Sequence, residues 1–110
     1  MTSRSKVVRK KAPRKKEANY FAGRRAEYRS IELLDKAGFI CVRAAGSKGP
    51  ADIVAIGKGP PVLVQVKRGK RGVSTAEREK LTEIARSYNC MVLIHTWKPH
   101  ARQPIAEEVR

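Results

Sequence analysis

Apolar residues recur at helical spacing from Gly23 onward. Ile31 and Leu34 fall on one face, and Gly38 follows where a helix would end, because glycine readily adopts the left-handed conformation that closes a helix. The next stretch, FICVRA at 39–44, is short, β-branched and aromatic at its start. These features predict a helix followed by a strand.

Two further short apolar stretches, ADIVAIG at 51–57 and VLVQVK at 62–67, are typical of strands. Glycine and proline recur in the intervals at 46–50 and 58–61, which predicts a turn in each. Because strands joined by tight turns pair antiparallel, we expect the strands at 39–44, 51–57 and 62–67 to form an antiparallel meander.

A second helix and a fourth strand are expected after the meander. Ser74 with Glu77 three residues later has the form of a capping box. The apolar stripe of the helix consists of Leu81, Ile84, Ala85 and Tyr88. MVLIHTW at 91–97 predicts a buried strand, and a strand–helix–strand connection implies a parallel pairing. The predicted fold class is α/β, a mixed β-sheet of αβββαβ order flanked by helices, with no assignment for the residues after Pro99.

Glu27 interrupts the apolar pattern of the first helix. It precedes Ile31 by four residues and Leu34 by seven, so it lies on the core-facing stripe, where an unpaired carboxylate is costly. The alternative is that Glu27 belongs to the first turn of the helix and faces solvent, where it interacts favourably with the helix dipole.

Asp52, Gln65 and Lys67 are polar where strands are expected. Asp52 opens the second strand and, taken alone, is typical of a turn. Gln65 and Lys67 share one face of the third strand, opposite the face of its three valines. An edge strand with one solvated face would explain this pair equally well.

Taken together, these polar residues predict a metal site. The expected hairpin brings Asp52 beside Gln65 and Lys67, and Glu27 lies on the nearby helix. Carboxylate and carbonyl oxygens are hard ligands that suit Mg²⁺ or Mn²⁺. A lysine beside such a metal can lower the pKa of a water molecule or orient it for attack on a phosphodiester.

The charge of the chain indicates a polyanionic partner. Its 110 residues, enough for one domain, include 25 Lys and Arg against 10 Asp and Glu, a net charge of +15. Nucleic acid is the first candidate and an anionic membrane the second. Residues 1–16 contain eight basic residues and no acidic one, which predicts a disordered basic arm over 1–19 before a folded domain at 20–110. A solvated tail is the simpler explanation of the same stretch.

Neither a membrane span nor a secretion signal is expected. No apolar run approaches about 20 residues, and the N-terminus lacks an apolar segment of the signal-peptide type. Cys41 and Cys90 are isolated in apolar stretches, which favours buried free thiols in a reducing compartment.

Three stretches in order, GRRAE at 23–27, VRAAGSKGPAD at 42–52 and VQVK at 64–67, carry a resemblance to a known family. They are similar to the PD-(D/E)xK nuclease superfamily, and in particular to the archaeal-type Holliday junction resolvases and their viral relatives. The resemblance implies a restriction-endonuclease-like sheet and identifies 20–110 as a nuclease domain.

The resemblance also implies roles for individual residues. The catalytic set would be Glu27, Asp52, Gln65, Lys67 and Ser47. The first three would hold Mg²⁺, with Mn²⁺ as a substitute, and Lys67 would position or activate the attacking water. Arg43 and Ser47 match a family segment that contacts the scissile region or supports the site. The expected DNA contacts are Arg24, Arg25, Arg43, Lys48, Arg68, Lys70 and Arg71, of which the last three would otherwise form a solvated basic loop.

Gln65 departs from the family pattern, which places glutamate at this position. A neutral amide removes one negative charge, so the metal should bind more weakly. Either the site still cleaves, or the chain keeps the binding surface without the chemistry. The retention of Glu27, Asp52 and Lys67 together favours an active enzyme, because a pure binding protein has no use for that set.

Together with these residues, the resemblance implies a metal-dependent, structure-selective endodeoxyribonuclease that resolves four-way DNA junctions by paired nicks. The resemblance implies a homodimer, which suits a two-fold substrate cut at two matched places. We expect it in the cytoplasm of a prokaryotic cell or a virus-infected host cell, with no membrane partner. The alternatives are a non-catalytic basic DNA- or RNA-binding protein on the same fold, or another PD-(D/E)xK nuclease.

Overall fold

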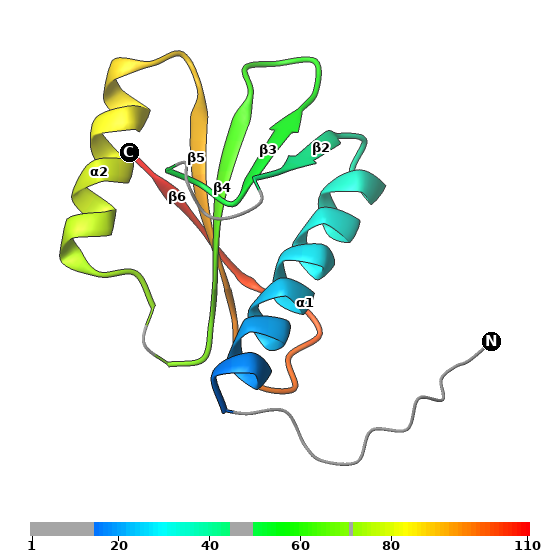
Figure 1. Cartoon of the computed structure of the whole chain (residues 1–110). Coiled ribbons are helices and arrows are strands. Elements are labelled where there is room, and N and C mark those ends of the chain that lie inside the picture. Colours follow the sequence, from blue (N-terminus) through cyan, green and yellow to red (C-terminus); the bar gives the residue numbers. More distant parts are fainter. Residues whose placement is uncertain (1–14, 45–49, 71) are drawn as a thin grey trace.

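A five-stranded sheet lies between two helices (Figure 1). A computed structural model describes residues 15–44, 50–70 and 72–110 of the chain. Its elements are, in order, α1 (Lys15–Lys36), β2 (Ile40–Arg43), β3 (Ile53–Ile56), β4 (Val62–Arg68), α2 (Thr75–Ser87), β5 (Met91–Trp97) and β6 (Ile105–Val109). The predicted α/β class and αβββαβ order are confirmed, and one further strand completes the sheet.

The strands lie in the order β2-β3-β4-β5-β6. Strands β2, β3 and β4 form the predicted antiparallel meander, in which Val42 pairs with Val54 and Val54 with Leu63. Strand β5 pairs parallel with β4, with Gln65 opposite Ile94, as the strand–helix–strand connection predicts. The sheet is therefore mixed, and β4 lies at its centre.

The last strand, β6, lies in the segment after Pro99 that carried no prediction. It pairs antiparallel with β5 and forms one edge of the sheet. Among its five residues Val109 alone is buried. Glu107 contacts α2 through a two-pronged ion pair, in which Arg78 Nη1 and Nη2 lie 2.7 and 3.1 Å from its two carboxylate oxygens.

Helix α1 begins at Lys15, so residues 15–19 of the segment expected to be a basic arm belong to the helix. Residues 1–14 lie outside the described residues. The helix ends as predicted before Gly38, whose φ of 100° lies in the left-handed region. Within the described part of the chain, neither helix has the length and apolar character needed to cross a membrane.

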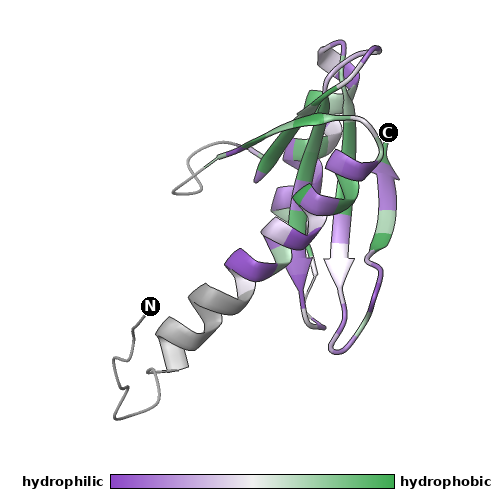
Figure 2. Cartoon of the chain, turned by 90° about the vertical axis from the view of Figure 1, so that its right-hand side faces the viewer, coloured by the Kyte–Doolittle hydropathy of each residue, from purple (hydrophilic) through white to green (hydrophobic). Residues whose placement is uncertain are grey.

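The two helices bury apolar residues against opposite faces of the sheet. Leu34 of α1 packs with Val64 and the other inward valines of β4, whereas Leu81 of α2 packs with Val92 and Ile94 of β5. Figure 2 shows the hydrophobic residues concentrated in the strands between the helices. Both cysteines are free thiols, as predicted, and are half-buried rather than buried.

Candidate active site

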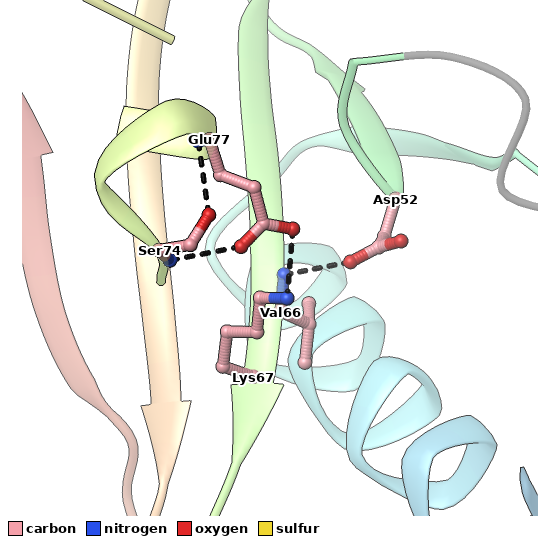
Figure 3. Close-up of polar contacts among 5 residues, drawn as sticks. All are labelled: Asp52, Val66, Lys67, Ser74 and Glu77. Carbon is pink, nitrogen blue, oxygen red and sulfur yellow. Dashed lines mark hydrogen bonds and ion pairs between the residues drawn. The ribbon is translucent and has the colours of Figure 1, made fainter. Parts of the chain in front are cut away.

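Asp52 lies just before β3, at the point where β3 and β4 separate. Its backbone N–H donates to Val64 O at 3.0 Å, which continues the strand pairing by one residue. Two residues further along β4, Asp52 Oδ2 accepts the hydrogen bond of the Val66 N–H at 2.8 Å (Figure 3). The Asp52 carboxylate is thus held where β3 and β4 separate, and the residue is only 8% exposed.

The surroundings of Asp52 disfavour its ionised form. Burial raises the pKa of its carboxyl above the ordinary value, while the Val66 N–H and the positive charges of Lys67 and Arg43 oppose this shift. The negative charge of Glu77 raises the pKa further. A cation beside Asp52 would offset the cost of keeping this buried carboxylate ionised.

Gln65 and Lys67 lie on the face of β4 that is turned toward α2. The burial of β4 alternates, with the three valines on the α1 face, so the predicted division of its two faces is confirmed. Both side chains are half-buried rather than fully exposed. Lys67 Nζ donates a hydrogen bond to Glu77 Oε2 at 3.0 Å, which connects the centre of the sheet to α2.

Glu77 is held by the capping box at the start of α2, as predicted. Its backbone N–H donates to Ser74 Oγ at 3.1 Å, and its Oε1 accepts from the Ser74 N–H at 3.0 Å. The second oxygen, Oε2, therefore remains for Lys67 (Figure 3). The Ser74 N–H, followed by Lys67, lowers the pKa of Glu77, which keeps this carboxylate ionised.

Glu27 forms an ion pair with Arg43. Arg43 Nε donates to Glu27 Oε1 at 2.8 Å, and the two side chains are only 21% and 17% exposed. The guanidinium also lies over the ring of Tyr28, 5.3 Å from its centre. Because α1 begins at Lys15, Glu27 lies in the middle of the helix, which rules out the alternative of a solvated first-turn residue.

Four of the predicted site residues meet in one cavity. It has a volume of about 580 Å³ and is lined by Glu27, Pro50, Asp52, Gln65, Val66, Lys67, Glu77, Lys80, Leu81 and Ile84. Ser47, the fifth predicted catalytic residue, lies outside the described residues. The cavity combines acidic, amide and basic side chains from α1, β4, α2 and the start of β3.

The sequence did not predict that Glu77 and Lys80 line this cavity. Glu77 was interpreted only as a helix cap. The signal was present, however, because Leu81 and Ile84 follow Glu77 by four and seven residues, which places Glu77 on the sheet-facing stripe of α2. A capping glutamate on that stripe lies on the side of α2 that faces the sheet.

The residues predicted to contact DNA differ in their exposure to solvent. Arg25, Arg68 and Lys70 are exposed, and Arg24 and Arg43 are half-buried. Lys48 and Arg71 lie outside the described residues.

The cavity offers oxygen donors that fit a hard cation. Asp52 Oδ1 accepts no hydrogen bond from any residue that the structure describes, and the side-chain oxygen of Gln65 lines the same space. Such donors suit Mg²⁺. Over the described ranges, no three His, Cys, Asp or Glu side chains gather in a metal-binding arrangement. Asp52 and Gln65 could therefore hold a metal, and the carboxylates of Glu27 and Glu77 are paired with basic side chains.

Comparison with known proteins identifies the family. The model of the archaeal Holliday junction resolvase (Hjc) family matches residues 18–106. The crystal structure of the Holliday junction resolvase Hjc from Archaeoglobus fulgidus superposes with a TM-score of 0.65 and 28% identity, over 80% of this chain and 73% of that one. No curated protein sequence matches the chain. The resemblance seen in the sequence and the restriction-endonuclease-like fold are both confirmed, and the chain belongs to the archaeal Holliday junction resolvase family.

Proposed function

We propose that this chain is a metal-dependent, structure-selective endonuclease that resolves four-way DNA junctions by paired nicks. The observation that carries the proposal is the meeting of Asp52, Gln65 and Lys67 in one cavity of a strongly basic chain of a resolvase family. A protein that only binds DNA gains nothing from a buried carboxylate beside a lysine. The pair instead suits the hydrolysis of a phosphodiester.

In this proposal Asp52 and Gln65, with Glu27 nearby, hold Mg²⁺ or Mn²⁺. A bound metal would supply positive charge that offsets the negative charge developing on the scissile phosphate. Asp52 is suited to this role because its position is fixed by Val66 and its Oδ1 remains available. For Glu27 to take part, its ion pair with Arg43 has to loosen, which DNA binding to Arg43 would favour.

Lys67 positions the attacking water or a phosphate oxygen in this proposal. Its ammonium lies in the cavity and, without metal, donates a hydrogen bond to Glu77 at 3.0 Å. A positioned ammonium can donate a hydrogen bond to a developing oxyanion. Ser47 would support the same region of the site.

The basic residues outside the cavity would hold the DNA through its phosphates. Arg25, Arg68 and Lys70 are exposed, so their charges are accessible to a polyanion. Arg24, Arg43, Lys48 and Arg71 complete the proposed contact set, and the basic N-terminal segment would add affinity that is independent of sequence.

We also infer that the active form is a homodimer. The described chain contains one candidate cavity with the predicted set, whereas resolution of a junction needs two nicks. A two-fold dimer places two such cavities at matched positions on a two-fold substrate. Light scattering after size-exclusion chromatography tests this inference, and a monomer that still makes paired nicks would contradict it.

One observation favours a second candidate function, a resolvase-like protein that binds junctions without cleaving them. The carboxylate of Glu27 is paired with Arg43, that of Glu77 is paired with Lys67, and Gln65 is neutral. In this arrangement Glu27 and Glu77 already have basic partners and do not require a metal. This candidate shares the binding surface and differs only in the chemistry.

A cleavage assay separates the two candidates. A labelled four-way junction and a linear duplex with the same arm sequence are incubated with the protein in Mg²⁺ or in Mn²⁺. The proposed nuclease cuts the junction, leaves the duplex intact and is inactive in EDTA. Junction binding without cleavage in either metal would favour the second candidate.

A further inference from the structure

Position 65 is a glutamine, but a carboxylate enters the same cavity from another element. Gln65 contributes only a neutral amide to the cavity. Glu77 enters the same cavity from the first turn of α2 and contacts Lys67, two residues beyond Gln65 on the same face of β4. The cavity lined by Gln65 thus also contains a carboxylate that comes from the helix instead of the strand.

The capping box orients this carboxylate before any ligand binds. The Ser74 N–H donates a hydrogen bond to Oε1 of Glu77, with 3.0 Å between the nitrogen and the oxygen. The other oxygen, Oε2, is therefore turned toward the sheet. The direction of Oε2 is evident from its 3.0 Å contact with Lys67 Nζ (Figure 3). Because the capping contact uses Oε1, a change of partner at Oε2 does not itself break the capping box.

Asp52 and Glu77 line the same cavity. Glu77 raises the pKa of Asp52 through its charge, and Lys67 lowers it. Two carboxylates that share a cavity repel unless positive charge lies between them. Lys67 provides one positive charge, and a divalent cation would provide the rest.

We propose that Glu77 supplies a carboxylate to the metal site, in place of the one that a glutamate at position 65 would provide. The proposal rests on the metal-dependent function proposed above. In it, Oε2 of Glu77 serves the cation, Gln65 remains a neutral oxygen donor, and Lys67 is released toward the DNA. The same side chain therefore restrains Lys67 when the metal is absent and binds the metal when it is present.

Binding of Mn²⁺ to the full-length protein without DNA tests this role independently of cleavage. Electron paramagnetic resonance of free Mn²⁺ gives the dissociation constant for the wild type, Glu77→Gln, Gln65→Glu and the double variant Gln65→Glu/Glu77→Gln. Glu79→Gln is the matched control, because Glu79 is an exposed glutamate of α2 that does not line the cavity. Circular dichroism confirms the fold of each variant, and glutamine keeps a carbonyl oxygen for Ser74 N–H.

We expect Glu77→Gln to weaken Mn²⁺ binding by about 10-fold or more, the usual range for perturbing the surroundings of a metal. Gln65→Glu should restore the affinity in the double variant, and Glu79→Gln should leave it unchanged. The rescue would show that a carboxylate at either position can serve the cation.

Two results would overturn the role of Glu77. An unchanged Mn²⁺ dissociation constant in Glu77→Gln, with slower cleavage at saturating metal, would make Glu77 only a positioning residue for Lys67. A loss of affinity that Gln65→Glu does not restore would show that the two positions are not equivalent. Either result leaves the nuclease function intact if the wild type cleaves junctions, whereas a wild type that binds no Mn²⁺ would contradict both proposals.

Discussion

Lys67 on β4 and Glu77 on α2 form a hydrogen-bonded ion pair with 3.0 Å between Nζ and Oε2. The pair holds the proposed catalytic ammonium inside the cavity. We expect Lys67→Ala to slow junction cleavage by about 10²- to 10⁴-fold, the usual contribution of a positioned proton-transfer group. Single-turnover rates measure the loss, and gel shifts measure junction binding, which should change little because one charge of many is removed. Lys58→Ala, an exposed turn residue, controls for net charge and should cleave normally.

Asp52→Asn should abolish cleavage and, without metal, stabilise the fold. Burial raises the pKa of Asp52, so the folded chain binds its proton more tightly than the unfolded chain. Protonation of Asp52 therefore stabilises the folded chain. This contribution is complete below pH 3.8, the ordinary pKa of the carboxyl group, and is lost as the pH rises through the raised pKa of the folded chain. Asparagine removes the buried charge and keeps an oxygen for the Val66 N–H.

Thermal unfolding in EDTA measures this effect. We expect Asp52→Asn to have a higher Tm than the wild type at pH 7, and the difference to shrink toward pH 4. Junction binding by the variant should equal that of the wild type. An equal or lower Tm at pH 7, or cleavage well above background, would contradict the assigned role of Asp52.

Gln65→Glu should lower the Mg²⁺ concentration needed for half-maximal cleavage. The substitution adds a negative charge beside Asp52 in the cavity, and changes of this kind shift metal affinity by about 10-fold or more. A Mg²⁺ titration of the cleavage rate measures the shift. Gln103→Glu adds the same charge at an exposed position and should leave the titration unchanged. Equal titrations for Gln65→Glu and the wild type would exclude position 65 from the metal site.

His95 should make the fold less stable in mild acid. Its Nδ1 lies 2.9 Å from Ser30 Oγ, which also accepts the indole N–H of Trp97 at 2.8 Å. Burial lowers the pKa of His95 below its ordinary value of 6.5. As the pH falls below 6.5, the unfolded chain takes up a proton that the folded chain excludes, so the free energy of unfolding decreases.

Urea denaturation at pH 7.5 and 5.5 measures this contribution. His95→Asn keeps an acceptor near Ser30 and removes the titration, so its stability should depend less on pH than that of the wild type. The same pH dependence in both proteins would show that His95 does not titrate across this range.

Periodicity was sufficient to predict most of the sheet, because the burial of β4 alternates from Val62 to Lys67 and the turn before it is short. Strand β6 could not be predicted in this way. Val109 is its one buried residue, and its attachment to α2 depends on the long-range ion pair of Arg78 with Glu107. Interactions of this kind leave no periodic pattern in the sequence.

The candidate site was predictable where strand register determines it. Asp52, Gln65 and Lys67 meet because the β3–β4 hairpin brings them together. The ion pairs around the site were harder to predict, because a long charged side chain can reach several neighbouring residues. Glu77 was already explained by its capping box, and the pairing of Glu27 with Arg43 depends on how α1 crosses the sheet.

Cleavage of a supercoiled plasmid that extrudes a cruciform is the most direct test of paired nicking by this chain. Two nicks within the lifetime of one complex convert the plasmid to the linear form, whereas uncoordinated cuts give nicked circles. With Mg²⁺ we expect linear product from the wild type and none from Asp52→Asn. A plasmid that remains supercoiled in both Mg²⁺ and Mn²⁺, although the protein binds the cruciform, would contradict the proposed function.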